Sequence, residues 1–300
     1  MKTVISVKNV KKSFGRKEIL HDISFDIHPG EIVGFVGPNG AGKTTTIKCI
    51  VGLQKINSGS IEINGINIKK NFKKAIAKVG AIVEGPDLYS SLTGRRNLKM
   101  IMDNYKNVDK SRLEEVIKIS GLGKRIDSKV STYSLGMKQR LGIAAALINK
   151  PDILILDEPT NGLDPEGIKE LREFIKEIAK SGCAVLISSH NLMELNSFIT
   201  HVCMIKNGNI IFNGELAELK NKSDEYTFEV SNVDKCVELF KDIYVSSTSN
   251  HINLKVTEKD IKKVLKKMLD NDIEILSFGK SRDENLEDVF FEKVGGNKID

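Results

Sequence analysis

Near the start of the chain, an apolar stretch runs without a break into a glycine-rich turn and a helix-forming segment. The stretch is Ile32–Val36, and the turn that follows reads Gly37-x-x-x-x-Gly42-Lys43-Thr44. A run that is apolar on both faces is typical of a strand buried within a parallel sheet. A strand, this loop and a helix in this order form a phosphate-binding loop, because glycines let backbone N–H groups surround the phosphates. We therefore expect a nucleotide to bind at Gly37, Pro38, Asn39, Gly40, Ala41, Gly42, Lys43, Thr44 and Thr45.

Strands and helices alternate over the first two thirds of the chain, which predicts an α/β fold built on a parallel sheet. Residues 86–150 lack the strand pattern and are predicted to form a helical subdomain. The other predicted elements are strands at 4–7, 23–27 and 32–36, a helix from 45 to about 52, a strand at 153–156, a helix at 166–180, and strands at 184–188 and 201–206.

The residue pattern changes after about residue 220. We expect a nucleotide-binding domain over residues 1–222 and a small C-terminal α+β domain over 223–300. In the second domain the predicted order is strand, helix, strand, strand, helix, strand, which is the ferredoxin-like order, with one more helix after it. The predicted strands are 226–230, 244–247, 252–256 and 273–278, and the helices are 233–241, 258–271 and 284–294. The lysines of the helix at 258–271 suit either a solvated face or an electrostatic docking surface.

Charge and cysteine usage narrow the kinds of partner. The net charge is +6 and the basic excess lies in residues 1–220, which suits an anionic ligand. Basic clusters interleaved with aromatic residues are not found, so we expect no nucleic-acid partner. The four cysteines form no CxxC pair, which favours reduced core residues in a cytoplasmic protein. No apolar run approaches the ~20 residues that cross a bilayer, so a membrane role would need another chain.

Two carboxylates end the predicted strand at 153–156. Because successive strand residues point to opposite faces, Asp157 and Glu158 are expected to perform different tasks. Acids at strand ends are often only caps of the next helix. The phosphate-binding loop in the same chain favours metal and water chemistry instead.

Upstream of these acids lies the segment Tyr133-Ser134-Leu135-Gly136-Met137-Lys138-Gln139-Arg140. It resembles the signature of ATP-binding cassette (ABC) ATPases, whose consensus is Leu-Ser-Gly-Gly-Gln followed by Gln-Arg. Ser134, Gly136 and the final Gln-Arg match, whereas Tyr133, Leu135 and Met137 depart. A hydroxyl residue and a glycine at a helix start offer N–H groups and a positive dipole end to an anion. In that family the segment caps the nucleotide of a second subunit, which implies a dimer, here a homodimer.

The resemblance covers about residues 2–220 and implies ATP and Mg²⁺ as cofactors. By position, Asp157 would hold Mg²⁺ through water, and Glu158 would polarise the attacking water. His190, which follows the predicted strand at 184–188, would contact the γ-phosphate. Asp164 lies in Asn-Gly-Leu-Asp, where the family has Ser-Ala-Leu-Asp, and would span the dimer interface. Phe14 stands where an aromatic ring stacks on adenine, although a plug in its strand is the other interpretation.

The clearest departure from the family is Glu84. The strand before it is normally followed by a glutamine that meets Mg²⁺ and couples to the membrane subunit. A carboxylate can still ligate Mg²⁺, so Thr44, Glu84 and Asp157 are the expected metal ligands. An acid at this loop is similar to ATPases that confer resistance to bacteriocins, particularly lantibiotics, and to bacitracin-type exporters.

The resemblance implies the ATP-hydrolysing subunit of an ABC exporter, for a peptide antibiotic, bacteriocin or other drug. It implies an integral membrane permease as partner and a place on the cytoplasmic side of the cell membrane. One alternative is the subunit of an importer. Another is a soluble ABC ATPase not coupled to transport, against which a single cassette without a heptad run or cysteine–histidine cluster argues.

Overall fold

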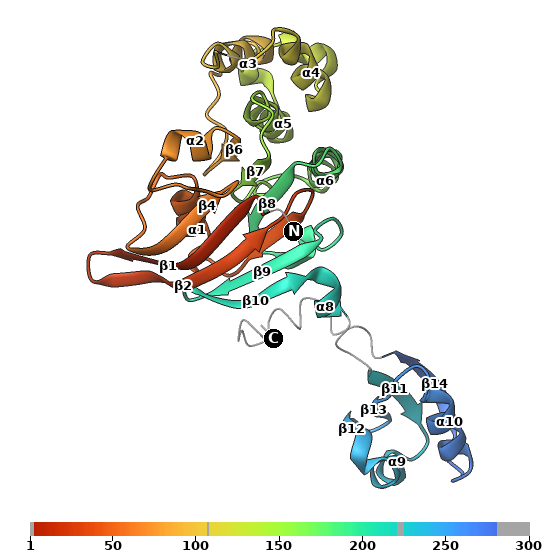
Figure 1. Ribbon diagram of the computed structural model, residues 1–300. Coiled ribbons are helices and arrows are strands. Elements are labelled where there is room, and N and C mark those ends of the chain that lie inside the picture. Colours follow the sequence, from red (N-terminus) through yellow and green to blue (C-terminus); the bar gives the residue numbers. More distant parts are fainter. Residues whose placement is uncertain (1–2, 107, 221–224, 281–300) are drawn as a thin grey trace. The chain divides into compact units, whose positions relative to one another are not determined.

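The computed structural model describes residues 3–106, 108–220 and 225–280 (Figure 1). The chain divides into two compact units, residues 1–215 and 216–300. The division falls a few residues before the boundary expected at 222. The helix predicted at 284–294 lies outside the described residues.

A six-stranded sheet carries the site-forming strands of the first unit, in the order β10-β9-β3-β8-β7-β6. Strands β3, β6, β7, β8 and β9 are parallel to one another, and β10 pairs with β9 in the antiparallel direction. Because β3, β7 and β8 are buried along their whole length, their sequences are almost uninterrupted apolar runs. The predicted parallel α/β sheet is confirmed, whereas β10 was not predicted. The strands are β3 (Ile32–Val36), β6 (Val79–Ile82), β7 (Ile153–Leu156), β8 (Ala184–Ser189), β9 (His201–Lys206) and β10 (Asn209–Glu215).

A second, antiparallel sheet in the order β2-β1-β4-β5 packs against the first. Its long hairpin extends well beyond the predicted strands at 4–7 and 23–27, because register shifts after Val7 accommodate a run of polar residues. One core joins both sheets, and the rings of Phe25 and Phe35 lie 5.6 Å apart within it. The strands are β1 (Ile5–Phe14), β2 (Lys17–Ile27), β4 (Ser58–Ile63) and β5 (Ile66–Asn67), of which the last two were not predicted.

Helices replace strands between β6 and β7, as predicted, and Figure 1 shows α3, α4 and α5 gathered beyond the β6 end of the sheet. Helix α5 packs closely on β6, since a Cβ at Gly80 would lie 2.5 Å from the carbonyl oxygen of Ala146. No described helix is long and apolar enough to span a bilayer. The helices of this unit are α1 (Lys43–Ile50), α2 (Phe72–Ile76), α3 (Gly94–Met102), α4 (Ser111–Ser120), α5 (Leu135–Ala146), α6 (Pro165–Lys180) and α7 (Leu192–Leu195).

The second unit begins with α8 (Leu216–Lys220) and has its own small core. Its sheet has the order β12-β13-β11-β14, and each neighbouring pair is antiparallel. The chain order is strand, helix, strand, strand, helix, strand, and the bounds differ from the expected ones by a few residues at most. The elements are β11 (Glu225–Val230), α9 (Val233–Leu239), β12 (Tyr244–Ser247), β13 (His251–Lys255), α10 (Ile261–Leu269) and β14 (Ile275–Lys280).

Candidate nucleotide site

The glycine-rich loop leaves the carboxyl end of β3 and enters α1. Its first residue is locked to the neighbouring strand, since Gly37 N–H donates to the Ser189 carbonyl at 3.2 Å. A Cβ at Gly37 would lie 2.1 Å from the Ile205 carbonyl oxygen, so only glycine fits there. Gly42, with φ 113°, is the N-cap of α1 and also lacks room for a side chain. The glycines thus hold a tight loop whose N–H groups suit phosphate.

Lys43 is the first residue of α1, and its side chain is only 5% exposed. Its ammonium donates to the carbonyl oxygens of Gly37 at 2.6 Å and Pro38 at 3.2 Å. It also pairs with the Glu158 carboxylate at 3.2 Å. The lysine is therefore folded back over its own loop, where the charge of a triphosphate can replace that of Glu158 as its partner.

Asp157 follows β7 and is buried beside the loop. Its Oδ1 accepts from Ser188 Oγ at 2.6 Å and from Thr44 Oγ1 at 3.3 Å. Threonine and aspartate oxygens are hard donors of the kind that Mg²⁺ takes, with phosphate oxygens and water as its remaining ligands. Among the described residues, no group of three or more His, Cys, Asp and Glu could hold a metal ion. The donor set thus fits a cation that arrives with a nucleotide.

Glu158 follows Asp157, and its carboxylate has different partners from that of Asp157. Its backbone is left-handed, with φ 48°, and its N–H donates to Ser188 Oγ at 2.8 Å. One carboxylate oxygen faces Lys43, and the other lies 2.9 Å from His190 Nδ1. His190 follows β8 and is partly exposed. The structure therefore brings Lys43, Glu158 and His190 together at the loop.

Ser188 was not singled out from the sequence, although it is fully buried and bonds to both acids. It lies on β8, which runs between β3 and β7 in the sheet. A serine near a strand end carries no sequence signal of its own. Its contribution follows only from strand order, which places its hydroxyl where it sets the directions of Asp157 and Glu158.

A hollow of about 480 Å³ joins the loop to the end of β1. Phe14 lies at its edge with the ring 47% exposed, and the Lys12 ammonium lies 4.5 Å from the ring centroid on one side. A half-exposed ring suits stacking better than a plug in the strand. The lining residues are Phe14, Lys17, Ile19, Asn39, Gly40, Gly42, Lys43, Thr44, Thr45, Glu158, Asn161 and His190. Lys17, Ile19 and Asn161 were not singled out from the sequence.

Glu84 does not line this hollow. It has a left-handed backbone, with φ 65°, and its exposed carboxylate pairs with the Lys48 ammonium at 2.5 Å. Lys48 belongs to α1 and lies about one helical turn after Lys43 and Thr44. The structure thus links the loop after β6 to the helix that carries Lys43 and Thr44. It does not place Glu84 beside Thr44 and Asp157, and its part in binding Mg²⁺ stays a prediction.

Ser134 and Gly136 also lie apart from the hollow. Ser134 is the N-cap of α5, and its Oγ accepts from Met137 N–H at 3.2 Å. Asp164 caps α6 in the same way, through Gly167 N–H at 2.9 Å. The two helix starts adjoin, because a Cβ at Gly162 would lie 3.0 Å from Leu135 Cδ2.

The departure at Tyr133 has a structural cause. Its ring is buried, and its hydroxyl donates to the Arg125 carbonyl at 2.6 Å. The hydroxyl lies above Gly94, where a Cβ would come within 2.5 Å of it. Burial raises the pKa of this phenol above its usual value, so the group stays a donor. The tyrosine thus fixes the segment before α5 to the start of α3.

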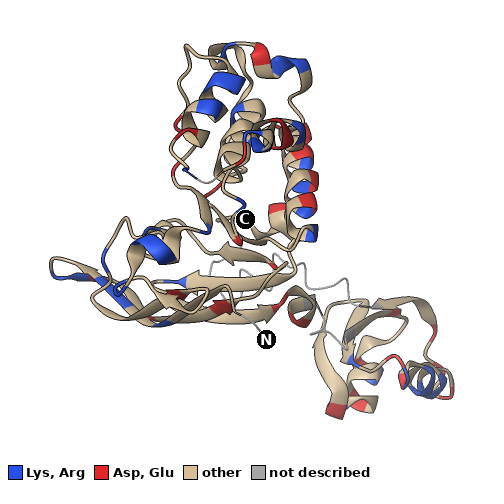
Figure 2. Ribbon diagram, turned by 45° about the horizontal axis from the view of Figure 1, so that its top comes forward, with Lys and Arg blue, Asp and Glu red and all other residues tan. Residues whose placement is uncertain are grey.

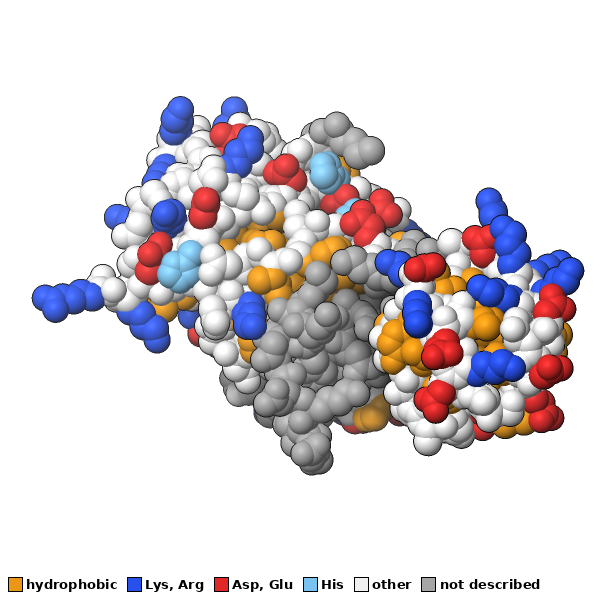
Figure 3. All heavy atoms as spheres, turned by 90° about the horizontal axis from the view of Figure 1, so that it is seen from below, with side chains coloured by type: hydrophobic (Ala, Val, Ile, Leu, Met, Phe, Trp, Pro, Cys, Tyr) orange, Lys and Arg blue, Asp and Glu red, His pale blue; other side chains and the backbone are white. Residues whose placement is uncertain are grey.

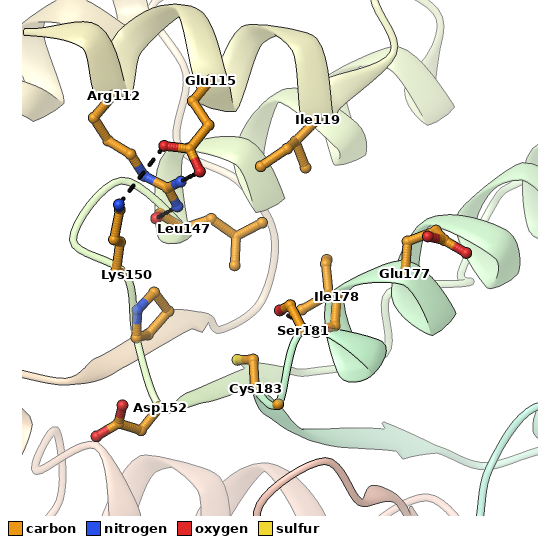
Figure 4. A pocket seen from close by; sticks show the side chains of 12 residues that line it. Arg112, Glu115, Ile119, Leu147, Lys150, Asp152, Glu177, Ile178, Ser181 and Cys183 are labelled. Carbon is orange, nitrogen blue, oxygen red and sulfur yellow. Dashed lines mark hydrogen bonds and ion pairs between the residues drawn. The ribbon is translucent and has the colours of Figure 1, made fainter.

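A separate hollow of about 550 Å³ lies between α4, the end of α5 and α6, and Figure 4 shows its lining. The buried Arg112 guanidinium bonds to the carbonyl oxygens of Leu147 and Ile148 and pairs with Glu115. Arg112 therefore satisfies the carbonyls of the C-cap of α5 and of the residue after it, and none of the predicted site residues lines this hollow.

A phosphate-binding loop after β3, an acid pair after β7 and a histidine after β8, the strand between these two, define a nucleotide-hydrolysing site. On an α/β core with a helical subdomain between the loop and the acids, they define the ABC type of ATPase.

The comparisons with known proteins agree. The model of the ABC transporter family matches residues 20–161. The uncharacterized ABC transporter ATP-binding protein YhcH of Bacillus subtilis (strain 168) is 41% identical over 99% of this chain and 98% of its own length. The bacitracin transport ATP-binding protein BcrA of Bacillus licheniformis is 39% identical over 100% of both chains. The lantibiotic transport ATP-binding protein SrtF of Streptococcus pyogenes is 39% identical over 76% of this chain and 97% of SrtF.

Among solved structures, the ATP-binding cassette MJ0796, a dimer in a post-hydrolysis state with ADP and phosphate, is 26% identical and has a TM-score of 0.62. The match covers 71% of this chain and 98% of that one. The present chain therefore belongs to the ABC transporter ATP-binding proteins, and it is an ATPase that binds ATP.

Proposed function

We propose that this chain is the ATP-hydrolysing subunit of an ABC exporter that removes a peptide antibiotic and so gives resistance. The observation that carries the proposal is the end-to-end similarity to the bacitracin transport protein BcrA, at 39% identity over the whole of both chains. The similarity to the lantibiotic transport protein SrtF supports the same class of cargo. The carboxylate at Glu84, which the resemblance first associated with such ATPases, agrees with both.

In this function the loop residues and Lys43 bind the β- and γ-phosphates of ATP. Thr44 and Asp157 hold Mg²⁺, which neutralises phosphate charge when bound. Glu158 orients and polarises the attacking water, and His190 holds the Glu158 carboxylate in place and faces the γ-phosphate. Phe14 stacks on adenine. Removal of Mg²⁺ with EDTA is expected to stop hydrolysis while ATP still binds.

The working unit in this proposal is a homodimer. Ser134 and Gly136 stand at the start of α5, outside the hollow that contains the loop of their own chain. The positive end of a twelve-residue helix is then free to meet the nucleotide of a second copy. Asp164, at the adjoining start of α6, would lie at the same interface. The dimeric cassette with ADP and phosphate is a precedent at the level of the family.

A membrane permease is the second partner, and it would hold the chain at the cytoplasmic side of the membrane. A groove of about 490 Å³ lies between α2, β6 and α3, with Leu53, Ile76 and Tyr105 among its lining residues. Val83 and Gly85, on either side of Glu84, also line it. An apolar helix of the permease seated there would contact the same loop that Glu84 ties to α1 through Lys48.

A sensitivity panel tests the proposed cargo. A strain that lacks this gene should become more sensitive to bacitracin or a lantibiotic. Its resistance to a ribosome-targeting drug should equal that of the parent strain. The intact gene should restore resistance, and a Lys43→Ala variant produced at the same level should not. An unchanged panel would contradict the proposal. Lost uptake of a nutrient in that strain would point to an importer instead.

A further inference from the structure

Exposed lysines lie at and near a small apolar hollow of the first unit that shares no lining residue with the candidate nucleotide site. Between Gly52 and Gly80 the sequence holds six lysines and one acid, Glu62. In Figure 2 the ribbon of α2, which lies in this stretch, is partly blue, the colour of Lys and Arg. All six are exposed and take part in no ion pair with any described residue, but Lys78 donates to the carbonyl oxygens of Asn149 and Lys150, which leaves five lysines without such a partner. We call them the α2 lysines: Lys55, Lys69, Lys70, Lys73 and Lys74.

The hollow has a volume of about 380 Å³ and an apolar lining. Ile56 and Ile68 form its buried wall, and Phe72 closes one side with its ring still 46% exposed. The ring packs on Gly52, where a Cβ would lie 2.2 Å from it. Two of the α2 lysines, Lys55 and Lys69, line the hollow itself. An exposed aromatic side chain at an apolar hollow, with lysines in its lining and on the adjoining helix, is suited to an anionic bilayer surface.

The position of the hollow favours a membrane over other anionic partners. Residues 51–54 line two hollows in alternation: Val51 and Leu53 face the groove proposed for the permease, and Gly52 and Gln54 face the apolar hollow. A permease in that groove would therefore bring the α2 lysines toward the leaflet in which it sits. Nucleic acids would need several stacking rings, and Phe72 is the single aromatic residue lining the hollow.

We propose that the α2 lysines and Phe72 form a docking surface for the anionic phospholipid headgroups of the cytoplasmic leaflet. The ammonium groups meet lipid phosphates, and the Phe72 ring enters the interface. The orientation on the membrane rests on the proposed function, but the binding chemistry does not, since it needs neither permease nor ATP. Each lysine that reaches an anionic surface is expected to raise the partition coefficient about fivefold.

Sedimentation with vesicles tests this surface on the full-length protein. Binding to vesicles of phosphatidylcholine with about a third phosphatidylglycerol should exceed binding to pure phosphatidylcholine by at least about tenfold at 0.1 M salt. It should largely disappear at 1 M salt, where the screening length falls from about 10 Å to about 3 Å. Equal binding to both kinds of vesicle would overturn the proposal.

Two variants assign the effect. Replacing Lys69, Lys70, Lys73 and Lys74 by glutamine should lower the partition coefficient at least about twentyfold, with melting temperature and ATP hydrolysis unchanged. Phe72→Ser should lower it severalfold and should leave the salt dependence in place.

The matched control removes four lysines from the second unit, at positions 259, 262, 263 and 266 on and beside α10. Acidic and basic side chains are interspersed on that unit in the view of Figure 3, and Lys263 already pairs with Asp260. This variant loses the same charge and should bind anionic vesicles like the parent.

Several results would defeat the inference. A control that loses vesicle binding as strongly as the α2 variant would show a general charge effect. Tight binding of a labelled oligonucleotide that needs the same four lysines would identify a nucleic-acid surface instead. The proposed antibiotic export is judged separately, by the sensitivity panel. If the sensitivity panel behaves as expected but the protein does not bind vesicles, only the docking surface is refuted. If the protein binds vesicles but the panel is unchanged, only the proposed antibiotic export is refuted.

Discussion

Replacing Glu158 by glutamine should have opposite effects on the two halves of the ATPase cycle. The Glu158 carboxylate lies 3.2 Å from the Lys43 ammonium, and the two side chains are 19% and 5% exposed. At an effective dielectric constant of about 20, the Coulomb attraction at this distance is about 5 kcal/mol before desolvation is subtracted. ATP must compete with this pair for the lysine, whereas a neutral amide would release it.

If about 1.4 kcal/mol of the pair survives desolvation, the variant should bind ATP about tenfold more tightly than the parent in EDTA. With Mg²⁺ present, hydrolysis should fall by about 10²–10⁴-fold, the usual contribution of a positioned base. The tightly bound ATP should also trap a dimer, since the ligand stabilises the state that binds it.

A fluorescent ATP analogue titrated without Mg²⁺ measures the affinity, phosphate release measures turnover, and gel filtration with ATP reports the dimer. Glu166→Gln is the matched control, because Glu166 is an exposed acid in the first turn of α6 and its replacement removes the same charge. Equal affinities for the two variants would refute the competition between Glu158 and ATP for Lys43. Undiminished hydrolysis by Glu158→Gln would refute its role as the base.

Three further predictions concern other parts of the first unit. Glu84→Gln breaks an exposed pair with Lys48 that stabilises the fold by at most about 1 kcal/mol, so the melting temperature should hardly change. Antibiotic resistance in cells should change, and an unchanged sensitivity panel would show that the acid has no part in the function. Gly37→Ala forces a Cβ to within 2.1 Å of a backbone oxygen, and should lower stability by about 2 kcal/mol or more in a denaturant titration and weaken ATP binding. Burial raises the pKa of Cys49 to about 11 and of Cys183 to about 12, so at pH 8 both thiols should react with a disulfide reagent only in denaturant, and fast labelling of the folded chain would contradict this.

The sequence predicted most of the framework that holds the site. The buried strand before the loop and the strand before Asp157 and Glu158 were predictable because strands apolar on both faces leave a continuous pattern. The long β1–β2 hairpin was not, since its outer part carries polar residues that no apolar alternation marks. Packing on other strands, rather than local preference, decides such segments.

Side-chain partnerships were the part that the sequence could not supply. Motifs placed Glu158 and Lys43 at one site, but their direct pairing depends on how the lysine folds back over its loop. Ser188 reaches both acids only because β8 lies between β3 and β7. The carboxylate of Glu84 pairs with Lys48, a contact that the sequence did not predict, and its part in binding Mg²⁺ stays a prediction. The order of strands in the sheet and the direction of the chain at a residue with left-handed backbone are set by tertiary structure, and a sequence motif does not contain them.

Two departures from the family consensus meet where the starts of α5 and α6 adjoin. Leu135 stands where the family consensus has glycine, and Gly162 stands where it has alanine. A methyl group at 162 would lie 3.0 Å from Leu135 Cδ2, and the backbone there is left-handed, with φ 76°. The two departures therefore compensate in volume, because an alanine at 162 would require the end of the Leu135 side chain to shift. Relatives with a large residue at the position of Leu135 should therefore favour glycine at the position of Gly162.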